Sequence, residues 1–314
     1  MKKVLILLGP TGVGKTGASI LLAGALGTEI ISADSMQIYR GMDIGTAKPT
    51  VEERRAVRHH MVDIVDPSES FSAGRYVAEV VPVIEGLHRR GRVPVMVGGT
   101  GLYIKAVTRG IFSGPSADWD LRDELLSLEE REKGALYAYL EETDPGAAAR
   151  IERNDIRRIL RAMEVFLKSH EKMSVLQERL TRPLPYEFVK IGLARERREL
   201  YRIINERVDD MFSRGLVEEV ERLLARGPDR TPLQAIGYKE VIPYIEGKIT
   251  REETVDLIKR NTRRYAKRQL TWFRKEEGIA WVDITGLRDS NSVFNEVRSV
   301  LSDLDPEVAR RAAV

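Results

Sequence analysis

The chain has 314 residues and a formal net charge of +3, with 42% hydrophobic and 32% charged residues. This composition is that of a folded globular protein and excludes an intrinsically disordered one. The absence of cysteine excludes disulfides and thiolate metal sites, and no stretch approaches the about 20 apolar residues of a membrane-spanning helix. From these absences we expect a cytoplasmic protein without a membrane segment.

The first motif follows the first predicted strand. Residues Val4–Leu8 are apolar, Gly9–Thr16 reads GPTGVGKT, and a helix is predicted over Lys15–Leu26. The pattern G-x-x-x-x-G-K-[ST] between a strand and a helix is typical of a phosphate-binding loop, whose backbone N–H groups surround phosphate oxygens. By itself it does not distinguish ATP from another polyphosphate. The predicted phosphate ligands are Gly9, Pro10, Thr11, Gly12, Val13, Gly14, Lys15 and Thr16, with the Thr16 hydroxyl suited to Mg²⁺.

Strand and helix signals then alternate along the first third of the chain, as in an α/β protein. Further strands are predicted over Glu29–Ser32 and Val93–Val97, and a helix over Gly74–Arg90. Asp34 follows the first of these strands, and the glycine-rich segment Gly98–Gly101 follows the second. Because ligands bind at the carboxyl ends of strands in open parallel sheets, we expect these loops to meet the phosphate loop at one site.

The segment Asp34–Pro49 has no helix or strand periodicity. We predict a long ordered loop, and such loops are usually functional. The Asp34 carboxylate could orient Mg²⁺ through water, accept a proton from a nucleophile, or only stabilise a turn.

Between Ser116 and Arg182 the strand signals vanish. The most regular segment is Asp155–His170, where Ile156, Ile159, Leu160, Met163 and Leu167 share one helix face. Arg157, Arg158 and Arg161 form a basic stripe, which fits either a solvated face or phosphate binding. We predict a phosphate-loop α/β core of residues 1–115 and 183–314, with a parallel sheet flanked by helices, and an inserted all-helical domain of residues 116–182.

The C-terminal part adds strands over Phe188–Leu193 and Ala280–Ile284 and helices over Arg195–Arg214 and Leu216–Arg226. A longer helix is predicted over Thr250–Lys275. It carries interleaved aromatic residues and an excess of cations, namely Lys259, Arg260, Arg263, Arg264, Lys267, Arg268, Arg274 and Lys275. A phosphodiester backbone is the natural complement to such a helix, although a merely solvated helix is the alternative.

Taken together, these segments resemble the tRNA dimethylallyltransferases, also called tRNA isopentenyltransferases. The most specific match is Asp34–Pro49, with Asp-Ser-x-Gln-x-Tyr followed by Gly-Thr-Ala-Lys-Pro. Gly12 departs from the family, which usually has Ala there. Since the chain lacks cysteine, it resembles the shorter bacterial form without a zinc finger, and no zinc is expected. Further matches are Gly9–Thr16, Gly98–Tyr103, Arg153–Val165, Ala235–Lys239 and Lys267–Arg274.

The resemblance implies the reaction. A dimethylallyl group would pass from dimethylallyl diphosphate to N6 of the adenosine 3′-adjacent to the anticodon, in tRNAs that read codons beginning with U. Diphosphate would be released. The implied partners are the donor and the tRNA anticodon stem-loop, which the helical domain would clamp. Mg²⁺ is the implied cofactor, and we expect a monomer.

The resemblance also implies roles for individual residues. Asp34 matches the proposed general base, and Lys15, Thr16, Thr100 and Arg207 match further catalytic positions. The implied tRNA-binding residues are Asp34, Ser35, Met36, Gln37, Thr100, Arg157, Arg158, Ile159, Leu160, Arg161, Gln234, Ala235, Ile236, Gly237, Tyr238, Lys239, Lys267, Arg268, Gln269, Trp272 and Arg274.

Three other functions share parts of this pattern. A nucleotide kinase or NTPase would use the same phosphate loop, but it leaves the basic helix and Asp34–Pro49 unexplained. A noncatalytic RNA-binding protein would explain the cations and leave Lys15 and Thr16 without a role. An enzyme that prenylates free adenine nucleotides would not need the long basic helix.

Overall fold

The computed structural model describes residues 2–311. These residues form two compact units. Unit 1 comprises the chain up to Phe71, Tyr76–Ile104 and the chain from Pro185 onward, and unit 2 comprises Ser72–Arg75 and Lys105–Leu184. The helical unit therefore begins before Ser116, where the strand signals of the sequence end. None of the helices within residues 2–311 is long and apolar enough to cross a membrane.

Unit 1 contains a six-stranded, entirely parallel sheet with the order β3-β2-β4-β1-β5-β6. Parallel strands are covered on both faces, which is why most of them read as continuous apolar runs in the sequence. The predicted α/β class with a parallel sheet is confirmed. The strands are β1 (Lys3–Leu8), β2 (Ile30–Ala33), β3 (His59–His60), β4 (Val95–Gly98), β5 (Glu187–Ala194) and β6 (Ile279–Asp283).

The register aligns the carboxyl ends of three neighbouring strands. Leu8 at the end of β1 pairs with Gly98 of β4, and Gly98 also pairs with Ala33 at the end of β2. The loops that begin at Gly9 and Asp34 therefore leave the sheet at the same level. This is the convergence that the sequence predicted.

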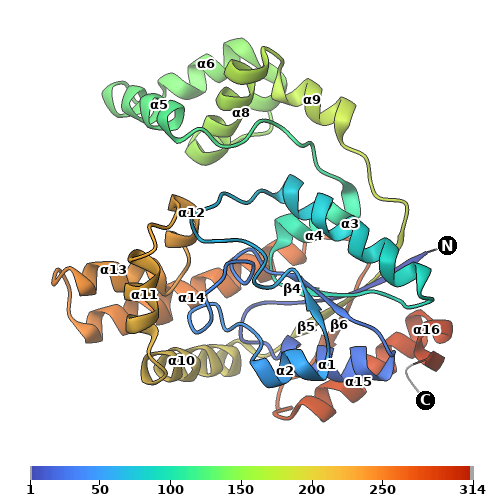
Figure 1. Ribbon diagram of the computed structural model, residues 1–314. Helices are drawn as coiled ribbons and strands as arrows, with labels where there is room; N and C mark the ends of the chain where they lie inside the picture. Colours follow the sequence, from blue (N-terminus) through green and yellow to red (C-terminus); the bar gives the residue numbers. More distant parts are fainter. Residues whose placement is uncertain (1, 312–314) are drawn as a thin grey trace. The chain divides into compact units, whose positions relative to one another are not determined.

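Helices cover both faces of this sheet, with α1 and α15 on one face and α3 and α4 on the other (Figure 1). Leu5, Leu22, Ile191 and Val297 belong to the core between the sheet and the first pair. The helices of unit 1 are α1 (Lys15–Ala25), α2 (Val51–Ala56), α3 (Ala73–Arg89, whose first residues belong to unit 2), α4 (Gly101–Arg109, whose second half enters unit 2), α10 (Arg197–Ser213), α11 (Leu216–Leu224), α12 (Arg230–Leu233), α13 (Tyr238–Ile245), α14 (Arg251–Phe273), α15 (Ser290–Leu304) and α16 (Pro306–Arg311).

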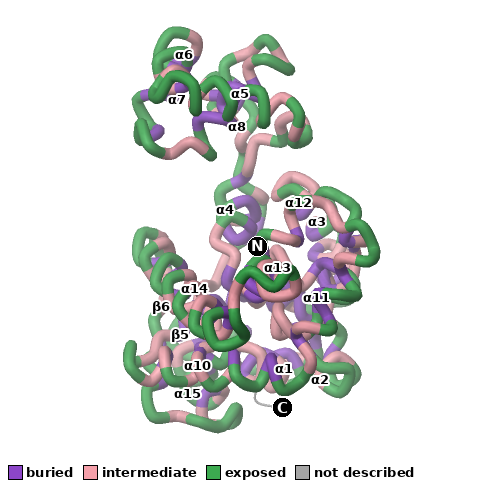
Figure 2. The backbone as a smooth tube through the Cα atoms, turned by 90° about the vertical axis from the view of Figure 1, so that its left-hand side faces the viewer, coloured by how far each residue is buried: buried purple, intermediate pink, exposed green. Residues whose placement is uncertain are grey.

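Unit 2 is helical and has a core of its own. Buried positions occur along α5 to α8 (Figure 2), and Leu140, Ile159 and Met163 belong to this core. Leu167, which the sequence assigned to the same face, is 36% exposed because it lies near the end of its helix. The helices are α5 (Trp119–Arg131), α6 (Ala135–Thr143), α7 (Pro145–Ala148), α8 (Ile156–Ser169) and α9 (Met173–Leu180).

Candidate functional site

A cavity of about 290 Å³ lies in unit 1 where the three loops meet. It contains the phosphate loop, the glycines that follow β4, and side chains from α10 and α14. Four residues with predicted catalytic roles line it: Lys15, Thr16, Asp34 and Arg207. The sequence interval between Asp34 and Arg207 is long, so the fold rather than local sequence brings them together.

The phosphate loop has the backbone geometry that its glycines permit. Gly12 and Gly14 have φ values of +79° and +105°, which an L-residue with a side chain rarely adopts. Helix α1 begins directly after Gly14, so its N-terminal N–H groups face the loop. The Lys15 ammonium group donates hydrogen bonds to the carbonyl oxygens of Gly9 (2.9 Å) and Pro10 (2.8 Å). Lys15 therefore lies over the loop and is positioned to meet an anion bound there.

Two cations and one carboxylate share the cavity. Burial lowers the pKa of Lys15 to about 8, the nearby Asp34 opposes this shift, and Arg207 adds to it. Burial also lowers the pKa of Arg207, again against the effect of Asp34. Removing water makes these charges interact strongly, and the pair of cations favours an anionic ligand.

Asp34 is held by the loop that it begins. Its Oδ1 atom accepts hydrogen bonds from the backbone N–H groups of Met36 (2.9 Å) and Gln37 (3.3 Å). No donor within residues 2–311 bonds its Oδ2 atom. One carboxylate oxygen thus fixes the orientation of the side chain, while the other remains available to a ligand.

Thr100 lies directly beside this carboxylate loop. Its hydroxyl accepts a hydrogen bond from the backbone N–H of Ser35 (3.0 Å), and its own N–H donates to the carbonyl of Ala33 (3.1 Å). Tyr265 on α14 lies near this hydroxyl, which acts to lower the pKa of the phenol. Burial and the negative charge of Asp34 raise the pKa of Tyr265 to about 12, so the phenol is neutral near pH 7.

The loop after Asp34 is ordered by buried polar contacts that the sequence analysis missed. Glu219 on α11 accepts hydrogen bonds from the backbone N–H groups of Asp43 (2.9 Å) and Gly45 (3.1 Å), among others. The Tyr238 hydroxyl donates to the same carboxylate at 2.5 Å. Lys48 is buried and donates to the Tyr39 carbonyl at 2.8 Å. The loop is thus fixed by side chains distant in sequence.

Gln37, a predicted tRNA contact, is already engaged in this loop. Its carbonyl oxygen accepts from the Ser32 hydroxyl (3.2 Å), and its amide donates to the carbonyls of Thr46 and Ala47 (both 3.3 Å). The Gln37 side chain supports the cavity wall in this structure.

Several predicted tRNA contacts are buried in this structure, and their part in tRNA binding stays a prediction. They lie on the inner faces of helices or in the core around the Asp34–Pro49 loop, because the matched segments include core positions as well as surface positions. Gln269 is also buried, and its amide bonds two loops of unit 1. The buried residues are Ile159, Leu160, Ala235, Gly237, Tyr238 and Gln269.

The other predicted tRNA contacts on α14 divide into two groups. Lys267, Arg268 and Arg274 are exposed, whereas Trp272 lies against Gly101, where an added Cβ would approach the indole ring to 2.6 Å. Two further cations of this helix are paired with α10: Lys259 with Asp209 and Arg263 with Asn205. The exposed cations remain available to a polyanion.

Outside α14, predicted tRNA contacts are exposed in both units. Arg157 and Arg158 lie at the exposed start of α8, and Gln234 and Lys239 are exposed near α13. Arg161 differs, since it pairs with the buried Glu164 in the core of unit 2. Ser35, Met36 and Ile236 are partly buried.

The donor set fits Mg²⁺ only together with an anionic ligand. Within residues 2–311 no group of three or more His, Cys, Asp or Glu side chains could hold a metal ion. The cavity does offer the Thr16 hydroxyl and the free oxygen of Asp34. Mg²⁺ is commonly bound by one or two such protein groups, substrate phosphates and water, so these residues suit it.

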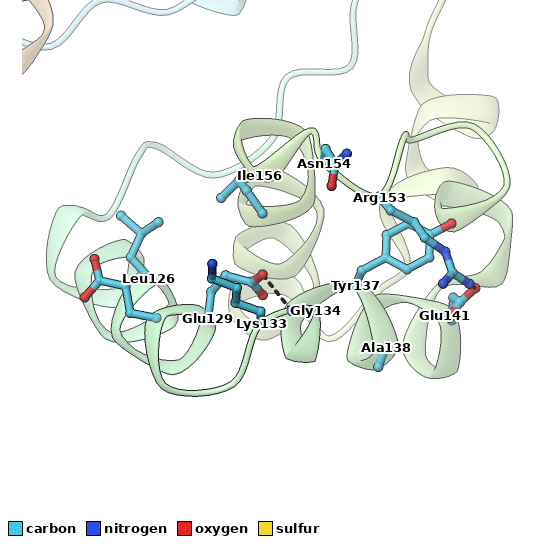
Figure 3. Close-up of a pocket in the computed structure, with 11 residues that line it drawn as sticks. Leu126, Glu129, Lys133, Gly134, Tyr137, Ala138, Glu141, Arg153, Asn154 and Ile156 are labelled. Atoms are coloured by element: carbon cyan, nitrogen blue, oxygen red, sulfur yellow. Dashed lines mark hydrogen bonds and ion pairs between the residues drawn. The ribbon is translucent and has the colours of Figure 1, made fainter.

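A larger hollow of about 620 Å³ lies on the surface of unit 2 (Figure 3). Three of its charged side chains are engaged with their own surroundings: Glu129 accepts from the Gly134 N–H at 2.8 Å, and Arg153 donates to Glu141 at 3.2 Å. No phosphate loop or converging carboxylate is present there. The smaller cavity, with its glycine loop and opposed charges, is the candidate active site.

Residues 37–276 match the family model described as IPP transferase. A tRNA dimethylallyltransferase of Thermodesulfovibrio yellowstonii is 53% identical over 310 residues, covering 96% of this chain and 98% of the relative. One of Thermotoga maritima is 50% identical over 301 residues, covering 95% and 98%.

Solved structures resemble the chain over its length. The tRNA isopentenylpyrophosphate transferase of Bacillus halodurans has 43% sequence identity and a TM-score of 0.72, covering 100% of this chain and 98% of that one. A eukaryotic dimethylallyltransferase acting on tRNA has 31% identity and a TM-score of 0.78, covering 99% and 80%.

Proposed function

We propose a mechanism for this chain on the basis of its family. The chain belongs to the IPP transferase family and is a tRNA dimethylallyltransferase, which prenylates an adenosine of tRNA. The acceptor atom is N6 of the adenosine 3′-adjacent to the anticodon, in tRNAs that read codons beginning with U. A bond forms between N6 and C1 of the dimethylallyl group while the bond from C1 to the diphosphate oxygen breaks. The electron pair of that bond leaves with the diphosphate, and one N6 proton leaves to a base.

The phosphate loop binds the diphosphate of the donor. The diphosphate lies in the Gly9–Thr16 loop, where backbone N–H groups after Thr11 and at the start of α1 bind its oxygens. Lys15 and Arg207 supply positive charge where negative charge develops. Interactions that strengthen as the C–O bond breaks accelerate the reaction, because they stabilise the transition state more than the bound donor. Mg²⁺, held by Thr16 together with the diphosphate, would supply further charge neutralisation there.

Asp34 accepts the proton from N6. An exocyclic adenine amine is a poor nucleophile because its lone pair is delocalised into the ring, and it becomes acidic only as the new bond forms. A carboxylate placed beside the amine can accept the proton at that stage. The free Oδ2 atom of Asp34 is suited to this role, and Thr100 holds the loop that carries it.

The target adenosine reaches the cavity by leaving the base stack of the anticodon loop, at a cost of a few kcal/mol. Exposed cations of α14 bind the phosphodiester backbone, and unit 2, with Arg157 and Arg158, forms the domain that clamps the stem-loop. Exclusion of water from the cavity protects an allylic cation from hydrolysis.

The observation that carries this mechanism is the meeting of a free carboxylate oxygen with two partly buried cations and a phosphate loop in one cavity. It is tested by incubating the enzyme with unmodified tRNA and dimethylallyl diphosphate and then digesting the tRNA to nucleosides. We expect one adenosine, next to the anticodon, to gain a C5H8 unit in mass spectrometry. Modification of free adenosine monophosphate, with tRNA unmodified, would contradict the proposed acceptor.

A further inference from the structure

We propose that Gln269 is a positioning residue rather than a tRNA contact. It fixes the phosphate loop, which binds the donor, relative to the loop after β4, which carries Thr100. The inference deepens the proposed function and rests on it. Gln269 lies on α14 between exposed cations, yet its side chain points into unit 1 and is only 7% exposed. Both halves of its amide are used there.

The amide joins the loops that follow two adjacent strands. Its oxygen accepts a hydrogen bond from the backbone N–H of Thr11 in the phosphate loop (2.9 Å), and its nitrogen donates to the carbonyl of Gly99 after β4 (2.8 Å). The position of the Thr11 N–H is therefore fixed by a side chain of α14. A single side chain thus connects the loop that binds diphosphate with the loop that carries Thr100.

Gln269 lines the cavity, and its amide has no spare room on the side of Gly99. A Cβ added at Gly99 would lie 2.3 Å from the Gln269 nitrogen, so only glycine allows the amide to reach the Gly99 carbonyl. Ala266 and Phe273, two buried neighbours on α14, are apolar and cannot replace the amide. Loss of the amide would leave the Thr11 N–H and the Gly99 carbonyl without this partner, and buried polar groups in that state are costly.

Two further contacts give this face of α14 a common role. Tyr265, one turn before Gln269, lies near the Thr100 hydroxyl, and Trp272 covers Gly101. These residues together hold the loop after β4, while Gln269 alone extends to the phosphate loop. Because reacting atoms must be placed to within a fraction of an ångström, a shift between the two loops would slow transfer without changing either substrate's own contacts.

The experiment compares Gln269→Met with wild type in steady-state kinetics and in tRNA binding. Methionine has a similar length and is apolar, so it fills the space and breaks both hydrogen bonds. We expect kcat at saturating tRNA and donor to fall at least tenfold, and the dissociation constant for tRNA to stay within twofold. Gln177→Met on α9 is the matched control, since Gln177 does not line the cavity, and wild-type kcat is expected for it.

A double-mutant cycle separates positioning from simple destabilisation. Gly99→Ala alone should lower kcat because the new methyl group displaces the amide, but it should have little further effect when Gln269 is already alanine. Thermal unfolding of each variant reports whether folding is intact.

Two results would overturn the inference. In the first, Gln269→Met weakens tRNA binding more than tenfold while kcat at saturation is unchanged. That result would show that Gln269 contacts tRNA. In the second, the double variant loses as much kcat as the product of the two single losses from Gly99→Ala and Gln269→Ala. The two residues would then act independently. Failure of wild-type enzyme to modify tRNA would instead contradict the proposed function, so the two failures are distinguishable.

Discussion

The Thr100 hydroxyl accepts a hydrogen bond from the backbone N–H of Ser35 at 3.0 Å, which ties the loop after β4 to the residue that follows Asp34. Thr100→Val keeps the shape of the side chain and removes the acceptor. We predict that it lowers kcat about tenfold or more, since Asp34 loses its support, with the KM for donor nearly unchanged. Thr100→Ser keeps the hydroxyl and should retain most activity. Full kcat in the valine variant would show that catalysis does not depend on the hydrogen bond between Thr100 and Ser35.

Asp34→Asn tests the general base. The amide oxygen can still accept from the Met36 and Gln37 N–H groups, so the loop should keep its conformation. Loss of the base predicts a fall in kcat of about 100- to 10,000-fold, with tRNA affinity within about tenfold of wild type. Single-turnover transfer and filter binding measure the two quantities. Equal losses in binding and in rate would indicate a structural role instead.

Lys15 gives the reaction a predicted alkaline limit. Its pKa is lowered to about 8, so the side chain is charged below that pH and neutral above it. Donor binding requires the charged form, and kcat/KM for the donor should therefore decline as the pH rises through about 8. Lys15→Arg keeps a positive charge throughout this range. Its profile should lack the decline even if its rate is lower, and an identical decline in the variant would assign the limit to another group.

Glu219 is predicted to stabilise the loop that begins at Asp34. Glu219→Ala removes the acceptor of several buried backbone N–H groups, including those of Asp43 and Gly45, and should lower the free energy of unfolding by about 3 kcal/mol or more. The exposed neighbour Glu218 is the control, and Glu218→Ala should change it by no more than about 0.5 kcal/mol. Urea unfolding gives both values. Equal effects of the two substitutions would mean that the loop does not depend on this carboxylate.

The exposed cations of α14 should set the salt dependence of tRNA binding. Replacing Lys267 and Arg268 by alanine removes two predicted phosphate contacts, and the slope of log K against log salt should become shallower by about 1.5 to 2. Activity at saturating tRNA should change less than affinity. An unchanged slope would place the RNA-binding surface elsewhere on the protein.

The strands and the principal helices could be predicted from the sequence because their signals are local. Val4–Leu8 and Val93–Val97 are apolar runs before glycines, and both correspond to strands of the sheet. Strand β3 could not be predicted in the same way, since His59–His60 is too short to show a periodicity. The convergence of Asp34 with the phosphate loop followed from the rule for carboxyl ends of parallel strands.

Residues that act across the fold gave weak local signals. Glu219 lies on the buried face of α11 among Leu216, Val220 and Leu223, and a lone acid on an apolar helix face was the only sign of its role. Gln269 lies likewise on the buried side of α14, within a segment whose cations indicated RNA binding. Their partners are distant loop backbones, so only the folded chain identifies them.

The most direct test is a structure of the enzyme with an anticodon stem-loop and a donor analogue in which sulfur replaces the bridging oxygen. We predict that the diphosphate lies in the Gly9–Thr16 loop beside Lys15 and Arg207, with the extruded adenine N6 about 3.5 Å from C1 and within hydrogen-bond distance of Asp34. A complex in which the diphosphate binds outside this loop, or in which N6 faces away from Asp34, would contradict the proposed mechanism.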